Sequence, residues 1–160
     1  MLALVLQAEG RAEEAETEAR RCLTINPTYA YGHYALAYTL LLQHKDGESL
    51  DECKLETAEG GQLNCLAIVY ARLGRIDDSD AALNRSIQTR GDSAAFGVAR
   101  VLAYRGQNER AFEWLNRAYE QRDPVLAYIK GDPNFRQIRG DSRYKALLQK
   151  LNLETVSAQE

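Results

Sequence analysis

Tyrosine and arginine side chains recur between residues 31 and 104 in a pattern that could bind a partner. Tyr31, Tyr34 and Tyr38 stand at i, i+3 and i+7, so they share one face of the helix expected there. Tyrosine offers apolar area with a hydroxyl, and arginine can hold a carboxylate through two hydrogen bonds. Both are favoured anchors at protein interfaces, so we expect non-covalent recognition. With the matching positions of the repeat described below, the candidate set is Tyr31, Tyr34, Tyr38, Asn64, Ile68, Arg72, Phe96, Arg100 and Tyr104. The pattern leaves open whether the tyrosine stripe lines a groove or belongs to the core.

Residues that could catalyse a reaction or hold a metal are scarce. His33 and His44 are the only histidines, and the chain has no HExxH motif and no phosphate-binding loop. The run Asp77-Asp78-x-Asp80 lacks the alternating ligands of a calcium loop, and acidic residues at a helix start are favoured by the helix dipole. We therefore expect no enzyme activity, no cofactor and no metal site. An enzyme with an unrecognised site is the least favoured alternative.

The three cysteines are interpreted as packing residues. Cys22, Cys53 and Cys65 are odd in number and show no CxxC spacing. This argues against a disulfide framework and against a zinc site. We expect free thiols, which favours the cytoplasm and leaves a periplasmic location as the alternative.

Composition and charge place the chain among globular proteins of ordinary domain size. The chain has 160 residues and a formal net charge of -3. The longest apolar run, around residues 38–42, is too short to span a bilayer, and the first residues lack the features of a secretory signal. Residues 1–80 carry 7 Lys and Arg against 14 Asp and Glu, while residues 81–160 carry 13 against 9. The mild overall balance gives no nucleic-acid footprint, but the two ends could face different partners, or each other in neighbouring molecules.

A unit of about 32 residues repeats along the chain. Gly74 and Gly106 are 32 residues apart, Gly10 lies two such units before Gly74, and His44 takes the place between them. Apolar residues recur at helical spacing on both sides of each of these positions, and small residues follow at +5 and +12, except that Glu56 stands at +12 from His44. This predicts pairs of helices, with a reversal at the glycine or at His44 and close packing at the small residues. Such pairs must stack to bury their apolar faces.

The pattern resembles the tetratricopeptide repeat family. The two segments that carry the resemblance are Leu66-Ala67-x-x-Tyr70-x-x-x-Gly74-x4-Ser79-x3-Leu83-x2-Ser86 and Val98-Ala99-x-x-Leu102-x-x-x-Gly106-x4-Ala111-x3-Leu115-x2-Ala118. The resemblance implies an all-α, right-handed α-solenoid of about four repeats whose first helices line a concave, partner-binding face. The period is shorter than the 34 residues usual for the family. The expected units are a partial repeat 1 (1–27), a degenerate repeat 2 (28–60), repeat 3 (61–91) and repeat 4 (92–123).

The segment after residue 123 is expected to cap the solenoid. Two Asp-Pro pairs, at residues 123–124 and 132–133, open short turns, and a helix with an apolar stripe follows. We expect a helical cap over 124–153 and a frayed tail over 154–160. The cap resembles C-terminal repeat modules of bacterial signalling proteins, in which repeats follow a nucleotide-cyclase (such as adenylate cyclase), winged-helix or kinase-like domain.

The start of the chain suggests a second mode of association. Met1 falls near the middle of the first expected helix, so we expect a fragment of a longer protein. The uncovered end would expose Leu2, Leu4, Val5 and Leu6. The favoured function is a non-catalytic scaffold or regulatory module for a protein or peptide partner. The alternative is a self-association module that forms homo-oligomers.

Overall fold

The computed structural model describes residues 5–7 and 9–153, and these residues form helices, short 3₁₀ turns and connecting loops, without strands. Residues 5–7 are helical. The α-helices that follow are α2 (Ala12–Ile25), α3 (Gly32–Leu42), α4 (Asp46–Leu55), α5 (Glu59–Arg72), α6 (Ile76–Arg90), α7 (Ala95–Tyr104), α8 (Asn108–Glu120) and α9 (Ser142–Lys150). The 3₁₀ turns are η1 (Gly91–Ala94), η2 (Pro124–Tyr128) and η3 (Pro133–Ile138). Among the described helices, none is long and apolar enough to cross a membrane.

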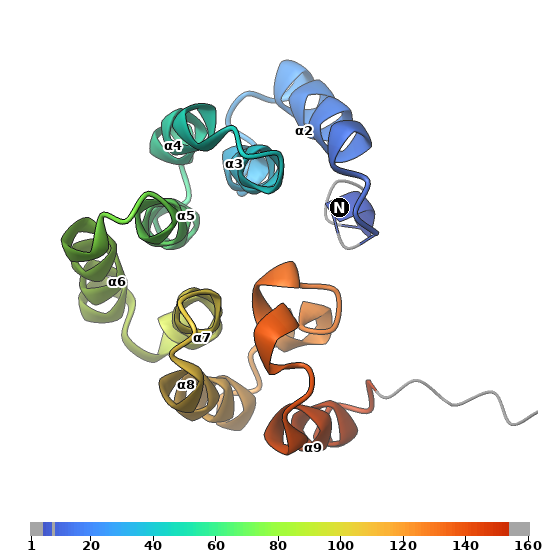
Figure 1. The fold of residues 1–160 in the computed structure, drawn as a ribbon, viewed down its shortest axis with the longest axis vertical. Coiled ribbons are helices and arrows are strands. Elements are labelled where there is room, and N and C mark those ends of the chain that lie inside the picture. The colour runs from blue at the N-terminus through green and yellow to red at the C-terminus, as the bar shows by residue number, and fades with distance from the viewer. Residues whose placement is uncertain (1–4, 8, 154–160) are drawn as a thin grey trace, which may run out of the picture.

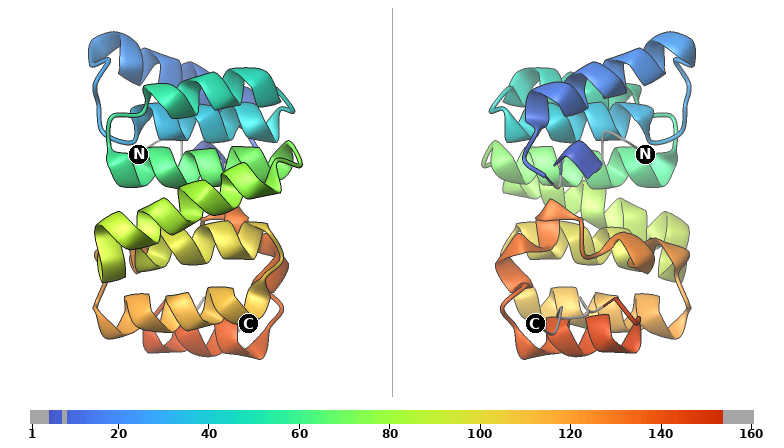
Figure 2. Two further views of the ribbon diagram at one scale, coloured as in Figure 1. Left: turned by 90° about the vertical axis from the view of Figure 1, so that its left-hand side faces the viewer. Right: turned by 90° about the vertical axis from the view of Figure 1, so that its right-hand side faces the viewer.

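The helices form a curved two-layered array. Helices α3, α5 and α7 line the inside of the curve, and α2, α4, α6 and α8 lie outside them (Figure 1). Side views show the helices stacked as successive rungs (Figure 2). The arrangement confirms the predicted all-α solenoid of helical repeats. The unit boundaries given above stay predictions, and α5 begins at Glu59, just inside the range predicted for the second unit.

The reversal inside each helix pair has one geometry. Gly10, Gly74 and Gly106 have φ values of 78°, 72° and 71°, and His44 takes the same left-handed conformation with φ 60°. At Gly74, the glycine amide donates to Ala71 O and the next amide donates to Tyr70 O. This pair of hydrogen bonds satisfies carbonyls at the end of a helix in a Schellman motif. The expectation that a glycine, or His44 in its place, closes each first helix is confirmed.

Small residues allow the two helices of a pair to approach closely. Ser49 Oγ donates to Ala37 O at 2.7 Å, and Ser79 Oγ donates to Ala67 O at 2.6 Å. Ala15 and Ala111 are fully buried at the matching positions of the first and fourth pairs. A larger side chain there would push the helices apart.

In the second unit, Glu56 stands where the other units have the small residues Cys22, Ser86 and Ala118. The structure shows what the Glu56 side chain does there. Glu56 is only 3% exposed. Its carboxylate accepts hydrogen bonds from the backbone amides of Tyr31 (3.1 Å), Tyr34 (2.9 Å) and Ala58 (2.8 Å). Amides at the start of a helix lack partners within the helix, and Tyr31 provides no side-chain cap to α3. Glu56 therefore caps α3 from the end of α4.

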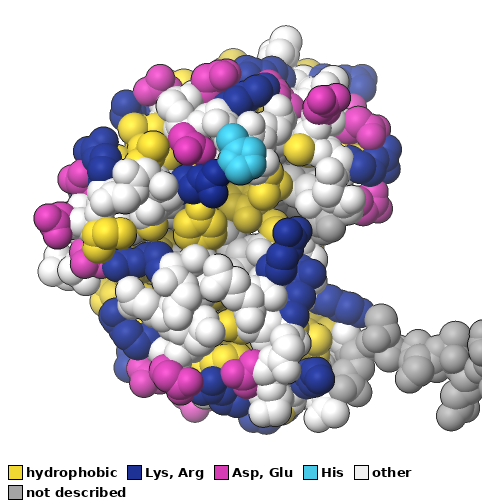
Figure 3. Space-filling model, in the orientation of Figure 1, with side chains coloured by type: hydrophobic (Ala, Val, Ile, Leu, Met, Phe, Trp, Pro, Cys, Tyr) yellow, Lys and Arg dark blue, Asp and Glu magenta, His cyan; other side chains and the backbone are white. Residues whose placement is uncertain are grey.

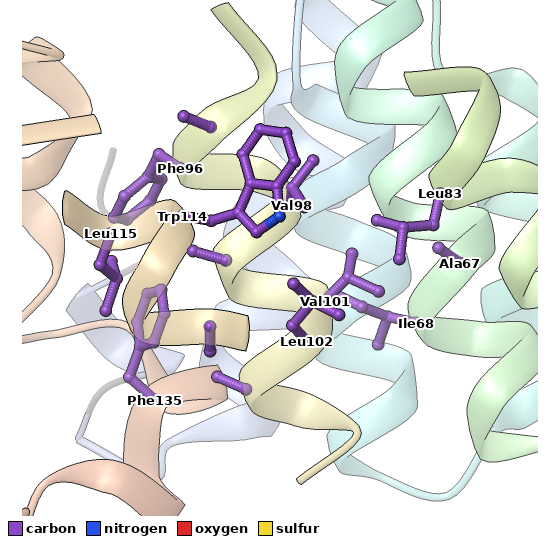
Figure 4. Packing of buried hydrophobic residues seen from close by; sticks show 14 of the residues in the cluster. Ala67, Ile68, Leu83, Phe96, Val98, Val101, Leu102, Trp114, Leu115 and Phe135 are labelled. Atoms are coloured by element: carbon purple, nitrogen blue, oxygen red, sulfur yellow. The ribbon is translucent and has the colours of Figure 1, made fainter. Parts of the chain in front are cut away.

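The hydrophobic core is continuous from α3 to α9. Buried residues of four helices and one turn meet around α7, where the close-up shows Phe135 and Phe96 side by side (Figure 4). The labelled residues are Ala67, Ile68, Leu83, Phe96, Val98, Val101, Leu102, Trp114, Leu115 and Phe135. The presence of Phe135 in this core fixes η3 against the inner side of α7.

The shared reversal geometry predicts the effect of substitution at Gly74. Gly74→Ala should lower the free energy of unfolding in urea by about 1 kcal/mol, because a Cβ is disfavoured at positive φ. A Cβ at Gly74 would meet no atom within 4 Å, so the cost is conformational and not steric. Gly47→Ala is the matched control, since Gly47 lies within α4 and its Cβ also meets nothing within 4 Å. That variant should gain stability, and equal effects of the two substitutions would contradict the account.

Candidate functional site

The predicted tyrosine stripe lies on the inner helix α3, but most of it is covered. Tyr34 and Tyr38 are each 7% exposed, whereas Tyr31 is 49% exposed. The rings of Tyr31 and Tyr34 meet edge to face, with centroids 6.3 Å apart. Burial raises the pKa of Tyr34 to about 12 and also raises the pKa of Tyr38. Of the two interpretations left open by the sequence, the core interpretation fits Tyr34 and Tyr38, and the groove interpretation fits Tyr31.

A buried ion pair joins the inner face to the C-terminal turns. Arg100 Nε of α7 donates to Asp132 Oδ2 at 2.6 Å, and their side chains are 15% and 8% exposed. The second oxygen of Asp132 accepts from the backbone and side-chain amides of Asn134, at 2.9 Å and 2.8 Å. Asp132 thus neutralises Arg100 and caps η3 at the same time.

Aromatic rings surround this ion pair. The guanidinium of Arg100 lies 4.9 Å from the ring centroid of Phe96 and 5.4 Å from that of Tyr34, within the range of cation–π contacts. The Phe96 and Phe135 centroids are 5.5 Å apart. Burial lowers the pKa of Arg100, but the Asp132 carboxylate together with Tyr34 and Tyr38 raises it above its ordinary value. Arg100 therefore keeps its charge, and its guanidinium pairs with Asp132 and stacks on rings of its own chain.

Asn64 and Ile68 continue the stripe on α5, and both are buried. A Cβ on Gly97 would lie 2.0 Å from Nδ2 of Asn64, so the side chain of Asn64 packs directly on the backbone of α7. Its Oδ1 has no hydrogen-bond partner among the described residues. Asn64 and Ile68 thus lie at the α5–α7 contact and present little surface to a partner.

Arg72 and Tyr104 lie at the carboxyl ends of α5 and α7, on one edge of the inner face. The Arg72 side chain is 36% exposed, and it contacts His44 Nδ1 and lies 3.6 Å from the Asp46 carboxylate. Burial raises the pKa of the half-buried Tyr104, and Arg72 opposes that rise. With Tyr31 at the opposite end of the inner helices, these residues are the accessible part of the candidate set.

A notch opens on one side of the molecule. In the space-filling view, a hollow opens between the first repeat and the C-terminal turns, and yellow apolar side chains line its inner end (Figure 3). The turns η2 and η3 lie inside the curve next to α7 (Figure 1). Six of the candidate groove residues are covered by packing between the inner helices and against the C-terminal turns: Tyr34, Tyr38, Asn64, Ile68, Phe96 and Arg100.

Sequence reasoning missed Asp132 as the partner of Arg100. The available signal was the second Asp-Pro pair, which predicts a turn but not its docking site. It also missed the role of Glu56, whose presence at a position otherwise filled by small residues was visible as an irregularity.

The interpretation of Cys53 and Cys65 as free packing thiols is wrong. The structure joins them in a disulfide between α4 and α5, with Cα atoms 5.4 Å apart, and leaves Cys22 free. Both cysteines are buried, so they do fill core positions, but they also link the second repeat covalently to the third. Their spacing of 12 residues gave no signal, because the stacking of one repeat on the next brings them together.

The candidate self-association residues are only partly described. Val5 is 50% exposed and Leu6 is 5% exposed, while Leu2 and Leu4 lie outside the described residues. The side-chain Nε2 of Gln7 donates hydrogen bonds to Ala35 O at 2.9 Å and to Thr39 Oγ1 at 2.7 Å. These bonds hold the first segment against α3. The predicted exposure of Leu6 is wrong because this docking buries it.

Residues 5–7 and 9–153 contain no group of three or more His, Cys, Asp or Glu side chains that could hold a metal ion. His33 contacts the Glu52 carboxylate at 2.7 Å and Pro27 O at 3.1 Å, so it ties the start of α3 to α4.

The comparisons with known proteins agree with the repeat geometry. The family model described as tetratricopeptide repeat matches residues 1–29. The left-handed reversals and buried small residues of this first unit recur in the units that follow, at intervals of 34, 30 and 32 residues. The chain is an α-solenoid of helical repeats, and its first unit matches the tetratricopeptide repeat model.

Among solved structures, the chain is similar to the crystal structure of YrrB, described as a TPR protein with an unusual peptide-binding site. The identity is 17%, the TM-score is 0.47, and the match covers 95% of this chain and 82% of that chain. No curated protein matches the chain.

The Arg100–Asp132 ion pair predicts a large effect of Asp132→Asn. This change keeps the shape and the cap of η3 but leaves Arg100 buried without a counter-charge, which should lower the free energy of unfolding by about 3 kcal/mol. Asp123→Asn is the matched control, because Asp123 caps η2 in the same Asp-Pro context but is bonded only to the amide of Val125. Its cost should stay below about 1 kcal/mol. Urea unfolding measures both, and similar losses would contradict the role of the ion pair.

The disulfide predicts the thiol count of the protein. The unfolded, unreduced chain should show one reactive thiol, from Cys22, and reduction should release the other two. Replacing both Cys53 and Cys65 by serine should lower stability by about 3 kcal/mol under oxidising conditions. Three reactive thiols without reductant, or no loss of stability, would show that the link is absent.

Proposed function

We propose that this chain is a non-catalytic interaction module that binds a segment of a partner protein in the notch of its concave face. The observation that carries the proposal is the hollow in the space-filling view, together with the exposed Tyr31 and Arg72 side chains at opposite ends of the inner helices. Tyrosine and arginine are the residue types most often dominant at interfaces. Arg100, Phe96 and Asn64 support the fold of the site and do not contact the partner.

The proposal includes the setting of the module. The resemblance of the C-terminal segment to repeat modules of bacterial signalling proteins supports a regulatory role within a larger protein. The buried disulfide supports an oxidising compartment, because disulfides persist there and are rare in the cytosol. This favours the periplasmic alternative over the cytoplasm.

Capture of a partner from a lysate of the source organism tests the proposal. Tyr31→Ala combined with Arg72→Ala should abolish capture, as measured by quantitative mass spectrometry, while circular dichroism stays unchanged. The matched control combines Tyr29→Ala with Arg85→Ala, because Tyr29 is 48% exposed and the Arg85 side chain is 68% exposed. Equal capture by both folded variants would contradict binding in the notch.

A further inference from the structure

The imidazole ring of His33 faces two hydrogen-bond acceptors. Its Nδ1 lies 2.7 Å from Oε2 of Glu52 on α4, and its Nε2 lies 3.1 Å from the carbonyl oxygen of Pro27. The side chains of His33 and Glu52 are only 16% and 19% exposed. A neutral imidazole has one N–H group and can donate to one of these oxygens, whereas the doubly protonated ring can donate to both.

The proton between His33 and Glu52 belongs to the ring, because an imidazole is a stronger base than a carboxylate. Within residues 5–7 and 9–153, Glu52 forms no other ion pair. The carboxylate can therefore compensate the charge of the ring fully. The geometry fits a positively charged His33 that donates from both nitrogens.

Other charged side chains at this end of the helices packed against α3 are engaged elsewhere. The carboxylate of Glu56 accepts hydrogen bonds from backbone amides. The remaining ion pairs on α2, α4 and α5 are Arg20 with Glu16, Lys54 with Asp51, and Glu59 with Arg85. Glu52 is thus the charged group that decides the protonation of His33.

The two hydrogen bonds of His33 hold the connection between α2 and α3, residues 26–31. This connection includes Pro27 and carries the exposed side chains of Tyr29 and Tyr31. Tyr31 has a φ of 64°, a left-handed conformation that is uncommon for a residue with a bulky side chain. Such a conformation persists only when the surrounding contacts impose it. Glu56 provides one of these contacts at the Tyr31 amide, and His33 provides another at Pro27.

We propose that His33 is a proton-dependent link that holds the connection 26–31 against α4. The charged ring joins Glu52 to Pro27, and loss of one proton breaks one of the two hydrogen bonds. Histidine side chains change charge between about pH 5 and 8. The link is therefore complete while the ring is charged and is lost as the pH rises through this range.

The link also affects the site proposed above, because Tyr31 belongs to the connection that it holds. A rise in pH should loosen the connection and weaken partner binding through Tyr31. This consequence alone rests on the proposed function, whereas the link itself is tested without a partner.

The test is the rate at which chymotrypsin cleaves the full chain after Tyr29 or Tyr31, followed by mass spectrometry between about pH 5 and 8. Cleavage there reports the population in which the connection is open. His33→Gln keeps one donor and does not titrate. The ratio of its rate to the wild-type rate at the same pH cancels the pH dependence of the protease. This ratio should be about fivefold at the acidic end, the effect of one hydrogen bond, and should approach one at the alkaline end.

His44→Asn is the matched control. Nδ1 of His44 contacts the guanidinium of Arg72, which can only donate, so this contact requires a neutral ring. Asparagine also tolerates the left-handed backbone of residue 44. The control variant should keep the wild-type dependence of cleavage on pH. Loss of that dependence in His44→Asn would overturn the role of His33.

Glu52→Gln provides a second variant should His33→Gln not fold. It keeps an acceptor but removes the negative charge that favours the charged ring, so its rate ratio should also fall as the pH rises. A ratio that stays constant with pH, in either folded variant, would overturn the link. Partner binding that does not change with pH, beside a confirmed link, would contradict only the step through the proposed function.

Discussion

The ion pair between Arg100 and Asp132 is the interaction on which the C-terminal half of the molecule depends. A guanidinium placed among Tyr34 and Phe96 would be costly without a counter-charge. Asp132 supplies that charge from the turns and at the same time caps η3, which brings Phe135 into the core. One carboxylate therefore satisfies a buried cation, starts a turn and closes part of the concave face.

Because the C-terminal turns cover part of the concave face, less of that face is accessible. The inner helices present aromatic and basic side chains in register, but the chain itself occupies the surface around Phe96 and Arg100. The remaining opening lies between the first repeat and the C-terminal turns. The residues that anchor the turns in the core thus also define one side of the opening.

The sequence predicted the elements formed by local spacing and failed where distant segments meet. Reversals at Gly74 and Gly106, and small-residue contacts such as that of Ser79, follow from positions a few residues apart. The burial of Tyr34 depends on a contact between α7 and a turn 32 residues later, and the periodicity carries no information on where that turn docks. The Cys53–Cys65 link was invisible for the same reason, because it depends on how one helix pair stacks on the next.

Hydrogen exchange of the backbone amides in residues 124–138 tests the central claim most directly. The amides of Leu126, Ile129 and Phe135 are hydrogen-bonded within the turns, and their side chains are buried. If the turns are an integral part of the solenoid, these amides should exchange as slowly as those of α7, through global unfolding. Exchange orders of magnitude faster than in α7 would show that the turns leave the concave face independently, and the closed inner face described above would be wrong.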